Sequence, residues 1–165
     1  MDKLKKESWG SAKYNDDFIL IETWSGYRLT ARDTKGAQHF LPIDEDNKTL
    51  GLAVLDALKH SRFLEKTHER DEFFDPEKRK LAYAEWVKNI MHKYGYKTKR
   101  AAFKNMHSCG ITMCENKMII SPLHHEKLEG WSSSKGDNLE DVYLSANDSP
   151  EAIGKALRLA FSRCY

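Results

Sequence analysis

Short apolar stretches separated by turn residues occupy the first third of the chain. Residues 16–30 combine an apolar run, a Ser25-Gly26 turn and an alternating stretch, a pattern typical of a β-hairpin. A second turn at 33–36 leads to another short apolar stretch at 38–43. The pattern therefore predicts a β-meander in this part of the chain.

Three longer segments space their apolar residues three or four positions apart, as in an amphipathic helix. We expect the first to begin with Thr49 as its N-cap. The second has the clearest boundaries, with Asp75 as N-cap, Pro76 at the first helical position and Gly95 just beyond its end. The third is predicted over residues 149–161.

Strand patterns return between the second and third helices. Residues 109–114 and 118–121 flank a turn and are predicted to form a hairpin, and residues 141–144 are predicted to form a final strand. The segment 131–138, rich in serine, is a loop by composition. Strands are therefore expected on both sides of the helical middle of the chain.

The first and third helices share a short pattern in which a glycine follows an aliphatic residue, at Leu50-Gly51 and Ile153-Gly154. Glycine inside a helix costs roughly 0.5–1 kcal/mol relative to alanine, so its recurrence indicates that each helix closely approaches the sheet. This shared pattern fits a weak internal β-α repeat, and it equally fits two ordinary amphipathic helices.

Together these elements predict an α+β fold in which about three or more helices cover a largely antiparallel sheet. A chain of 165 residues is expected to form one domain. We therefore expect a single domain over residues 1–165, in which residues 1–8 are flexible.

Composition narrows the possible partners and the location. The 27 basic and 25 acidic residues give a net charge of +2, less basic than a dedicated nucleic-acid-binding domain, which disfavours nucleic acid as a partner. The longest run without a polar side chain, residues 50–55, is far shorter than the ~18 residues of a membrane span, and the charged start lacks the apolar stretch of a secretory signal. Three cysteines are too few for a disulfide framework. These features favour a cytoplasmic protein without membrane association.

Charge is unevenly distributed along the chain, and its acidic part suggests a protein-binding surface. Residues 64–77 carry six acidic and two basic side chains around two phenylalanines that we expect to be exposed, and residues 44–46 form a second acidic loop. Carboxylates speed encounter with a basic protein, and phenylalanine supplies buried contact area. The same carboxylates would equally suit the N-terminus of a helix. The candidate binding residues are Asp44, Glu45, Asp46, Glu69, Asp71, Glu72, Phe73, Phe74 and Asp75.

A basic stretch follows and offers RNA binding as the alternative function. Residues 78–104 carry nine basic side chains and one acidic side chain. Lysine and arginine beside tyrosine suit a nucleic-acid backbone and its bases, although a solvated helix face has the same composition. The residues concerned are Lys97, Lys99, Arg100 and Lys104, with Tyr94 or Tyr96.

His107, Cys109 and Cys114 are the candidates for thiol or zinc chemistry. Zinc ligands usually come in short knuckles, and on an extended strand Cys109 and Cys114 would point to opposite faces. A cysteine nucleophile would need an orienting group besides the histidine, and none is evident. The sequence also contains no Walker loop, dinucleotide-binding glycine pattern or nucleophile elbow. We therefore expect no enzyme activity, no metal and no cofactor.

Blocks spread along most of the chain resemble the CdiI family, the immunity proteins of contact-dependent growth inhibition (CDI). The blocks are Phe40–Asp44 with Thr49–Phe63, Tyr94–Met106, Ile120–Glu129 and Ser149–Cys164. The resemblance implies a non-enzymatic cytoplasmic protein that binds and neutralises the C-terminal toxin domain of a CdiA protein, as a monomer or in a one-to-one complex. Toxin domains of this system are often nucleases, whose phosphate-binding surfaces would attract carboxylates. The resemblance transfers no contact residue, so the candidate binding residues rest on charge alone.

Overall fold

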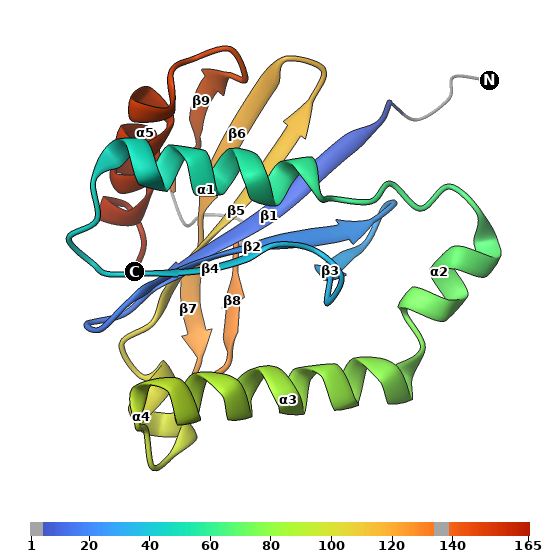
Figure 1. Ribbon diagram of the computed structural model, residues 1–165, viewed down its shortest axis with the longest axis vertical. Coiled ribbons are helices and arrows are strands. Elements are labelled where there is room, and N and C mark those ends of the chain that lie inside the picture. Colours follow the sequence, from blue (N-terminus) through green and yellow to red (C-terminus); the bar gives the residue numbers. More distant parts are fainter. Residues whose placement is uncertain (1–4, 134–138) are drawn as a thin grey trace.

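A large antiparallel sheet forms the centre of the computed structural model, which describes residues 5–133 and 139–165 (Figure 1). Its seven strands are β1 (Glu7–Tyr14), β2 (Ile19–Gly26), β3 (Thr30–Arg32), β4 (Gln38–Leu41), β5 (His107–Cys114), β6 (Lys117–Pro122) and β9 (Val142–Ser145). They lie in the order β3-β2-β1-β5-β6-β9, and β4 also pairs with β2. A separate two-stranded ribbon consists of β7 (His124–Lys127) and β8 (Gly130–Ser132).

Helices pack against both faces of this sheet. The helices of the described residues are α1 (Asn47–Lys59), α2 (Thr67–Phe73), α3 (Pro76–Tyr94), α4 (Lys99–Phe103) and α5 (Pro150–Ser162). Two consecutive residues of β2 show the two faces: Ile21 belongs to the apolar cluster of α1 and α5, whereas Leu20 belongs to the cluster of α3 and α4. The predicted α+β fold, with a largely antiparallel sheet covered by helices, is thus confirmed for the described residues.

The central strand β1 is the main element that the hydrophobic pattern does not predict. It pairs with β2 on one side and with β5 on the other, and Ser11 and Lys13 are buried within it. Because polar residues occupy buried positions, the strand lacks the clean alternation that marks a half-exposed strand. The order of the sheet therefore depends on a segment with a weak local signal.

The expected hairpins are present, but the predicted β-meander is wrong for the pairing of its last strand, β4. β2 pairs with β3 and β5 pairs with β6, as predicted. β4, however, pairs with β2 rather than with β3, through Ile21 and His39 among others. The reason lies in the turn between β3 and β4, where the buried Asp33 and a hydrogen bond from Thr23 N to Ala37 O (3.0 Å) return the chain to the same edge of β2.

Side-chain caps define where the helices begin. The Asp75 carboxylate accepts a hydrogen bond from Lys78 N at 3.0 Å, and Gly95 ends α3 with a φ of 70°, so both predicted boundaries are confirmed. The N-cap of α1 is Asp46 rather than Thr49, because Thr49 N donates to the Asp46 carboxylate at 2.7 Å.

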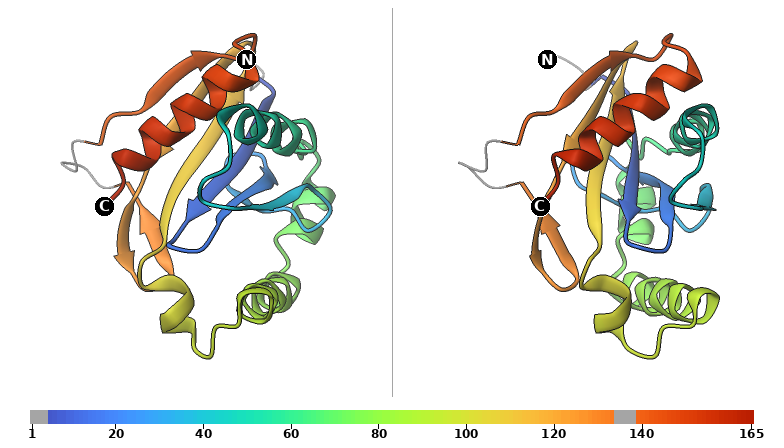
Figure 2. Two further views of the ribbon diagram at one scale, coloured as in Figure 1. Left: turned by 60° about the vertical axis from the view of Figure 1, so that its left-hand side comes forward. Right: turned by 90° about the vertical axis from the view of Figure 1, so that its left-hand side faces the viewer.

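The two glycines of the shared sequence pattern explain how α1 and α5 pack side by side (Figure 2). A Cβ atom at Gly51 would lie 1.8 Å from the carbonyl oxygen of Pro150, and one at Gly154 would lie 1.9 Å from that of Asn47. Each helix therefore places its glycine on the first residue of the other helix. The expected close approach is present, but it joins helix to helix rather than helix to sheet.

Two expectations fall partly outside the described residues. The flexible start predicted for residues 1–8 includes residues 1–4, which are not described, whereas Glu7 and Ser8 belong to β1. The loop predicted for 131–138 includes the undescribed residues 134–138, and its first two residues belong to β8. Among the described parts of the chain, no helix combines the length and the apolar character that crossing a membrane would require.

Candidate functional site

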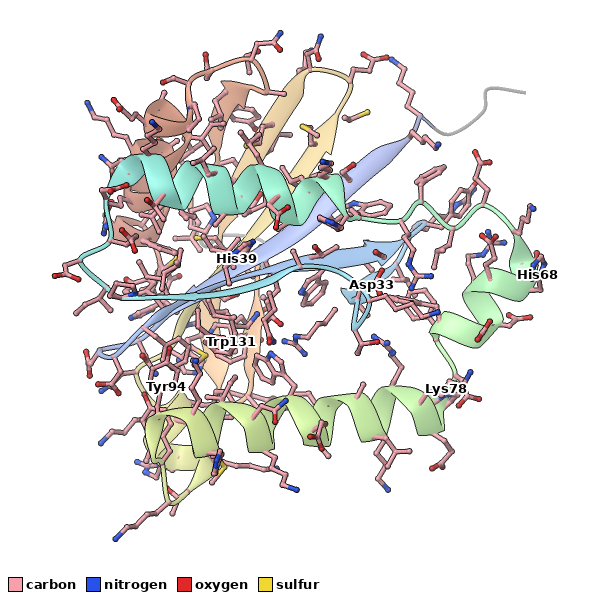
Figure 3. The ribbon with its side chains drawn as sticks, in the orientation of Figure 1. Asp33, His39, His68, Lys78, Tyr94 and Trp131 are labelled. Atoms are coloured by element: carbon pink, nitrogen blue, oxygen red, sulfur yellow. The ribbon has the colours of Figure 1, made fainter. Side chains whose placement is uncertain are left out.

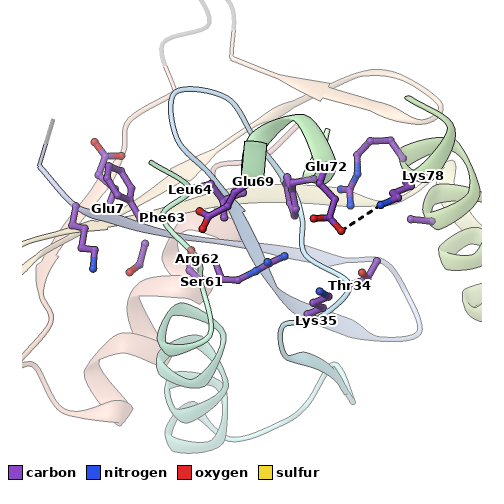
Figure 4. A pocket seen from close by; sticks show the side chains of 15 residues that line it. Glu7, Thr34, Lys35, Ser61, Arg62, Phe63, Leu64, Glu69, Glu72 and Lys78 are labelled. Carbon is purple, nitrogen blue, oxygen red and sulfur yellow. Dashed lines mark hydrogen bonds and ion pairs between the residues drawn. The ribbon is translucent and has the colours of Figure 1, made fainter. Parts of the chain in front are cut away.

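A cleft of about 680 Å³ lies beside α2 (Figure 4). It forms where the start of β1, the turn after β3, the segment after α1, α2 and the start of α3 meet. Its charged lining residues are Lys6, Glu7, Lys35, Arg62, Glu69, Glu72, Lys78 and Arg79. Segments that are far apart in sequence therefore contribute to one surface.

An ion pair between the buried Asp33 and the partly exposed Arg62 fixes the wall of this cleft. Asp33, whose side chain is only 1% exposed, accepts hydrogen bonds from Arg62 Nε at 2.7 Å, Arg62 Nη2 at 3.0 Å and Ser25 Oγ at 2.6 Å. Burial alone would raise the pKa of Asp33, but the hydrogen bonds from Arg62 and Ser25 favour the carboxylate, and the pKa lies below its ordinary value. The pair thereby joins the segment after α1 to the turn between β3 and β4, close to α2 (Figure 3).

Phe73 attaches α2 to this wall and is not the exposed anchor that the sequence suggested. Only 8% of Phe73 is exposed, and two guanidinium groups lie near its ring, with Arg62 Cζ at 5.5 Å and Arg79 Cζ at 4.4 Å from the ring centre. Phe74 packs edge-on against Phe73 and is partly buried. The two phenylalanines therefore stabilise the position of α2.

The acidic residues of the α2 segment divide into three groups. Glu69 and Glu72 line the cleft, and the Glu72 carboxylate lies 3.4 Å from Lys78 Nζ. Asp71 is exposed but does not line the cleft. Asp75 caps α3. Of the acidic candidates in this segment, Glu69 and Glu72 are thus the two that the structure brings to the cleft.

The second acidic loop lies at the other end of α1 and does not join this surface. α1 has 13 residues, so its ends are separated by about 20 Å. Asp44 is exposed, the carbonyl group of Glu45 accepts a hydrogen bond from the Arg158 guanidinium, and Asp46 caps α1. The two acidic patches are therefore separate surfaces.

The cleft carries charges of both signs, which the acidic run around α2 did not indicate. Five cationic side chains face three carboxylates in its lining, because β1, the turn after β3 and the start of α3 contribute lysine and arginine residues. Among the described residues, Lys6, Lys35 and Glu69 form no ion pair within 4 Å. These three charges are available to a partner.

A second hollow of about 400 Å³ adjoins the cleft and shares Thr34, Arg79 and Ala82 with it. Its wall contains Lys13, whose Nζ lies 5.6 Å from the ring of Trp24 and 5.2 Å from that of Trp131 (Figure 3). Burial lowers the pKa of Lys13 to about 8, and the nearby Arg32 acts in the same direction. Sequence reasoning did not identify this aromatic and cationic surface, because its residues come from separate strands and share no motif.

The basic segment does not form an open stacking surface for bases. The ring of Tyr94 stacks on Phe18 with a centroid distance of 4.3 Å, and the hydroxyl of Tyr96 donates to Asp17 and accepts from Asn15 Nδ2. Lys97, Lys99, Arg100 and Lys104 are exposed. The two tyrosines thus pack within the fold, which leaves a solvated cationic face.

The proposed thiol and zinc residues form no such centre among the described residues. No group of three or more potential metal ligands is present in residues 5–133 and 139–165. Cys109 packs in the cluster of α1 and α5, and the ring of His107 packs against Tyr14 with centroids 5.1 Å apart. Burial lowers the pKa of His107, with a smaller contribution from His125 in the same direction.

Known proteins match the chain over its whole length. The family model described as "CDI immunity protein", CdiI, matches residues 8–164. The immunity protein CdiI-YPIII of Yersinia pseudotuberculosis serotype O:3 is 43% identical and covers 99% of both chains.

Solved structures agree with this match. A protein of unknown function from Neisseria meningitidis superposes with a TM-score of 0.91 at 43% identity, covering 100% of this chain and 99% of the other. A chain from a CdiA-CT/CdiI toxin and immunity complex of Yersinia pseudotuberculosis superposes with a TM-score of 0.82 at 39% identity, covering 99% of this chain and 100% of the other. With a family model and a relative that both span nearly all of it, the chain belongs to the CdiI family of CDI immunity proteins.

Proposed function

We propose that this immunity protein neutralises the C-terminal toxin domain of a CdiA protein by binding it at the cleft beside α2, in a one-to-one complex in the cytoplasm. The proposal follows from family membership and from the relative that is described in a toxin and immunity complex. Protection requires binding only, so we assign no enzyme activity to the chain.

The observation that supports this surface most strongly is the lining of the cleft. It carries the charges of Lys6, Lys35 and Glu69, none of which forms an ion pair within 4 Å with another described side chain. Charged side chains that line a cleft without forming an ion pair in the free protein can form one with a complementary protein, and water is excluded as the complex forms. Asp33, Arg62 and Phe73 hold the wall in place before the partner arrives.

We further propose that the toxin is a nuclease. Glu69 and Glu72 would face basic side chains that otherwise contact phosphate groups, and Lys6 and Lys35 would face carboxylates of the toxin. The separate Asp44–Glu45 loop, about 20 Å away along α1, is a second predicted contact that only a broad interface would include.

The test is co-purification with the toxin domain encoded beside this chain, followed by titration calorimetry. The variants Glu69→Lys with Glu72→Lys, and Lys6→Glu with Lys35→Glu, should each weaken binding by roughly tenfold or more. Glu85→Lys, an exposed change on α3 outside the cleft, is the matched control and should leave affinity unchanged. Full affinity in both cleft variants would reject this surface, whereas no complex with the wild type would reject the partner.

Charge reversal of Asp44 with Glu45 separately tests the second loop. Weaker binding by this variant would include the loop in the interface, and unchanged affinity would remove it. RNA binding is tested in the same preparation: an affinity for RNA that falls steeply with salt would favour the alternative function, and we expect none.

A further inference from the structure

Two of the three cysteines lie in contact although they are far apart in the sequence. Cys109 in β5 and Cys164, two residues beyond α5, are separated by 55 positions, and their Sγ atoms lie 3.5 Å apart. Both thiols are free; Cys109 is fully buried and Cys164 is partly exposed. The two sulfur atoms are thus in direct contact, and a disulfide would require them to approach to about 2.05 Å.

The C-terminal tail is held in this position by several other contacts. Cys164 Sγ lies 3.4 Å from Ser108 O and 3.5 Å from Ala160 O, and Cys164 N donates to Phe161 O at 3.2 Å. The carbonyl group of the next residue, Tyr165, accepts a hydrogen bond from His125 N in β7 at 2.6 Å. The thiols therefore meet because both ends of the contact are fixed.

The two sulfur atoms are also chemically unequal. The hydrogen bond between the two thiols lowers the pKa of Cys164 and, together with burial, raises the pKa of Cys109. A thiol with a lowered pKa that solvent can reach is the one that reacts first with an oxidant. Cys164 is thus suited to attack and Cys109 to resolve the product.

We propose that Cys109 and Cys164 are a modification site that hydrogen peroxide converts into a reversible disulfide. The Cys164 thiolate attacks one peroxide oxygen, the O–O bond breaks, and the hydroxide that leaves takes up a proton to become water. The Cys109 thiol then attacks the sulfur of the resulting sulfenic acid, so that the S–S bond forms and a second water leaves. Two thiols are oxidised, one peroxide is reduced to two waters, and an external dithiol restores the starting state by exchange.

The cross-link would connect the end of α5 to the middle of the sheet. It closes a loop of 55 positions that contains β6, β7, β8, β9 and α5, which restricts the unfolded chain far more than the folded one. For a domain of this size, we expect the midpoint of thermal unfolding to rise by roughly 5–10 °C on oxidation. Neither cysteine lines the cleft beside α2, so toxin binding should not change.

The test treats the full chain with hydrogen peroxide and compares intact masses, non-reducing peptide maps and thermal unfolding before and after dithiothreitol. We expect the loss of two hydrogen atoms, a peptide that joins Cys109 to Cys164, and a rise in the unfolding midpoint that dithiothreitol reverses. Cys164→Ser should abolish all three effects, and Cys114→Ser, which keeps both partners, should retain them.

Cys164 is partly exposed, so its serine variant should fold, and its unfolding midpoint before oxidation verifies this. The proposal is overturned if oxidation yields a sulfinic acid without a cross-link, if Cys114 is found in the linked peptide, or if Cys164→Ser still shows the reversible rise.

Discussion

The crossing of α1 and α5 allows a sharp prediction for Gly154→Ala. In a typical helix this change would stabilise the protein by roughly 0.5–1 kcal/mol, because alanine has the higher helix propensity. Here the new Cβ would lie 1.9 Å from the carbonyl oxygen of Asn47, whereas real Cβ contacts essentially never fall below 3.0 Å. The obstacle is backbone, so it cannot rotate away as a side chain would, and the helices must separate by about 1 Å.

Such a separation weakens the apolar packing between the helices. A gap of this size forfeits roughly a quarter to a half of each close contact that it opens, among residues that include Leu50, Ala53, Leu157 and Ala160. Overpacking of this kind costs roughly 1–3 kcal/mol and sometimes more. We expect a net destabilisation of about 2–3 kcal/mol, which lowers the unfolding midpoint by roughly 5–10 °C.

Urea and thermal denaturation of Gly154→Ala and Gly51→Ala would measure this cost. The matched control is Gly110→Ala in β5, where a new Cβ meets no atom within 4 Å, so its stability should stay within about 0.5 kcal/mol of the wild type. Unfolding midpoints of both helix variants equal to that of the wild type would refute the reasoning.

Three further predictions concern the buried charges and the caps. Asp33→Ala should reduce the free energy of unfolding by about 2–3 kcal/mol in urea titrations at pH 7, because it leaves Arg62 and Ser25 without their acceptor. The pKa of Asp33 is lowered in the folded state, so the contribution of Asp33 to the free energy of unfolding is fully present above the ordinary carboxyl pKa and is lost as the pH falls through the folded-state pKa. On acidification, the stability of the wild type should therefore drop more steeply than that of Asp33→Ala. The pKa of Lys13 is lowered to about 8 in the folded state, so above that pH the unfolded state binds more protons than the folded state. The free energy of unfolding should therefore receive a contribution from Lys13 that increases between pH 8 and about 10.4 and is absent in Lys13→Met. Equal pH profiles of the two proteins would contradict this. Asp46→Ala should lower the unfolding midpoint by a few degrees. Thr49→Ala should lower it less, since this variant loses the side-chain hydrogen bond to Asp46 but keeps the backbone N–H that donates to the cap.

Features that depend on neighbouring residues in the sequence could be predicted. The Asp75 cap and Gly95 end of α3, the β5–β6 hairpin and the start of α5 at Pro150 all follow from local hydrogen bonding and backbone geometry. The blocks that resemble the CdiI family likewise identified the family that the comparisons support. The unequal charge of successive segments is also encoded locally, and the acidic segment 64–77 contains α2.

What only the tertiary structure decided are the neighbours of these segments. Phe73 is buried, and the guanidinium groups of Arg62 and Arg79, from segments on either side of α2, lie near its ring. The cleft is mixed in charge because strand pairing brings Lys6 and Lys35 beside Glu69, which no local run of residues encodes. Local periodicity and capping act over a few residues, whereas the charge and exposure of a surface depend on pairings between distant strands. The sequence alone therefore determined the three long helices, the hairpins and the family, whereas the packing determined the place of β1 and the site.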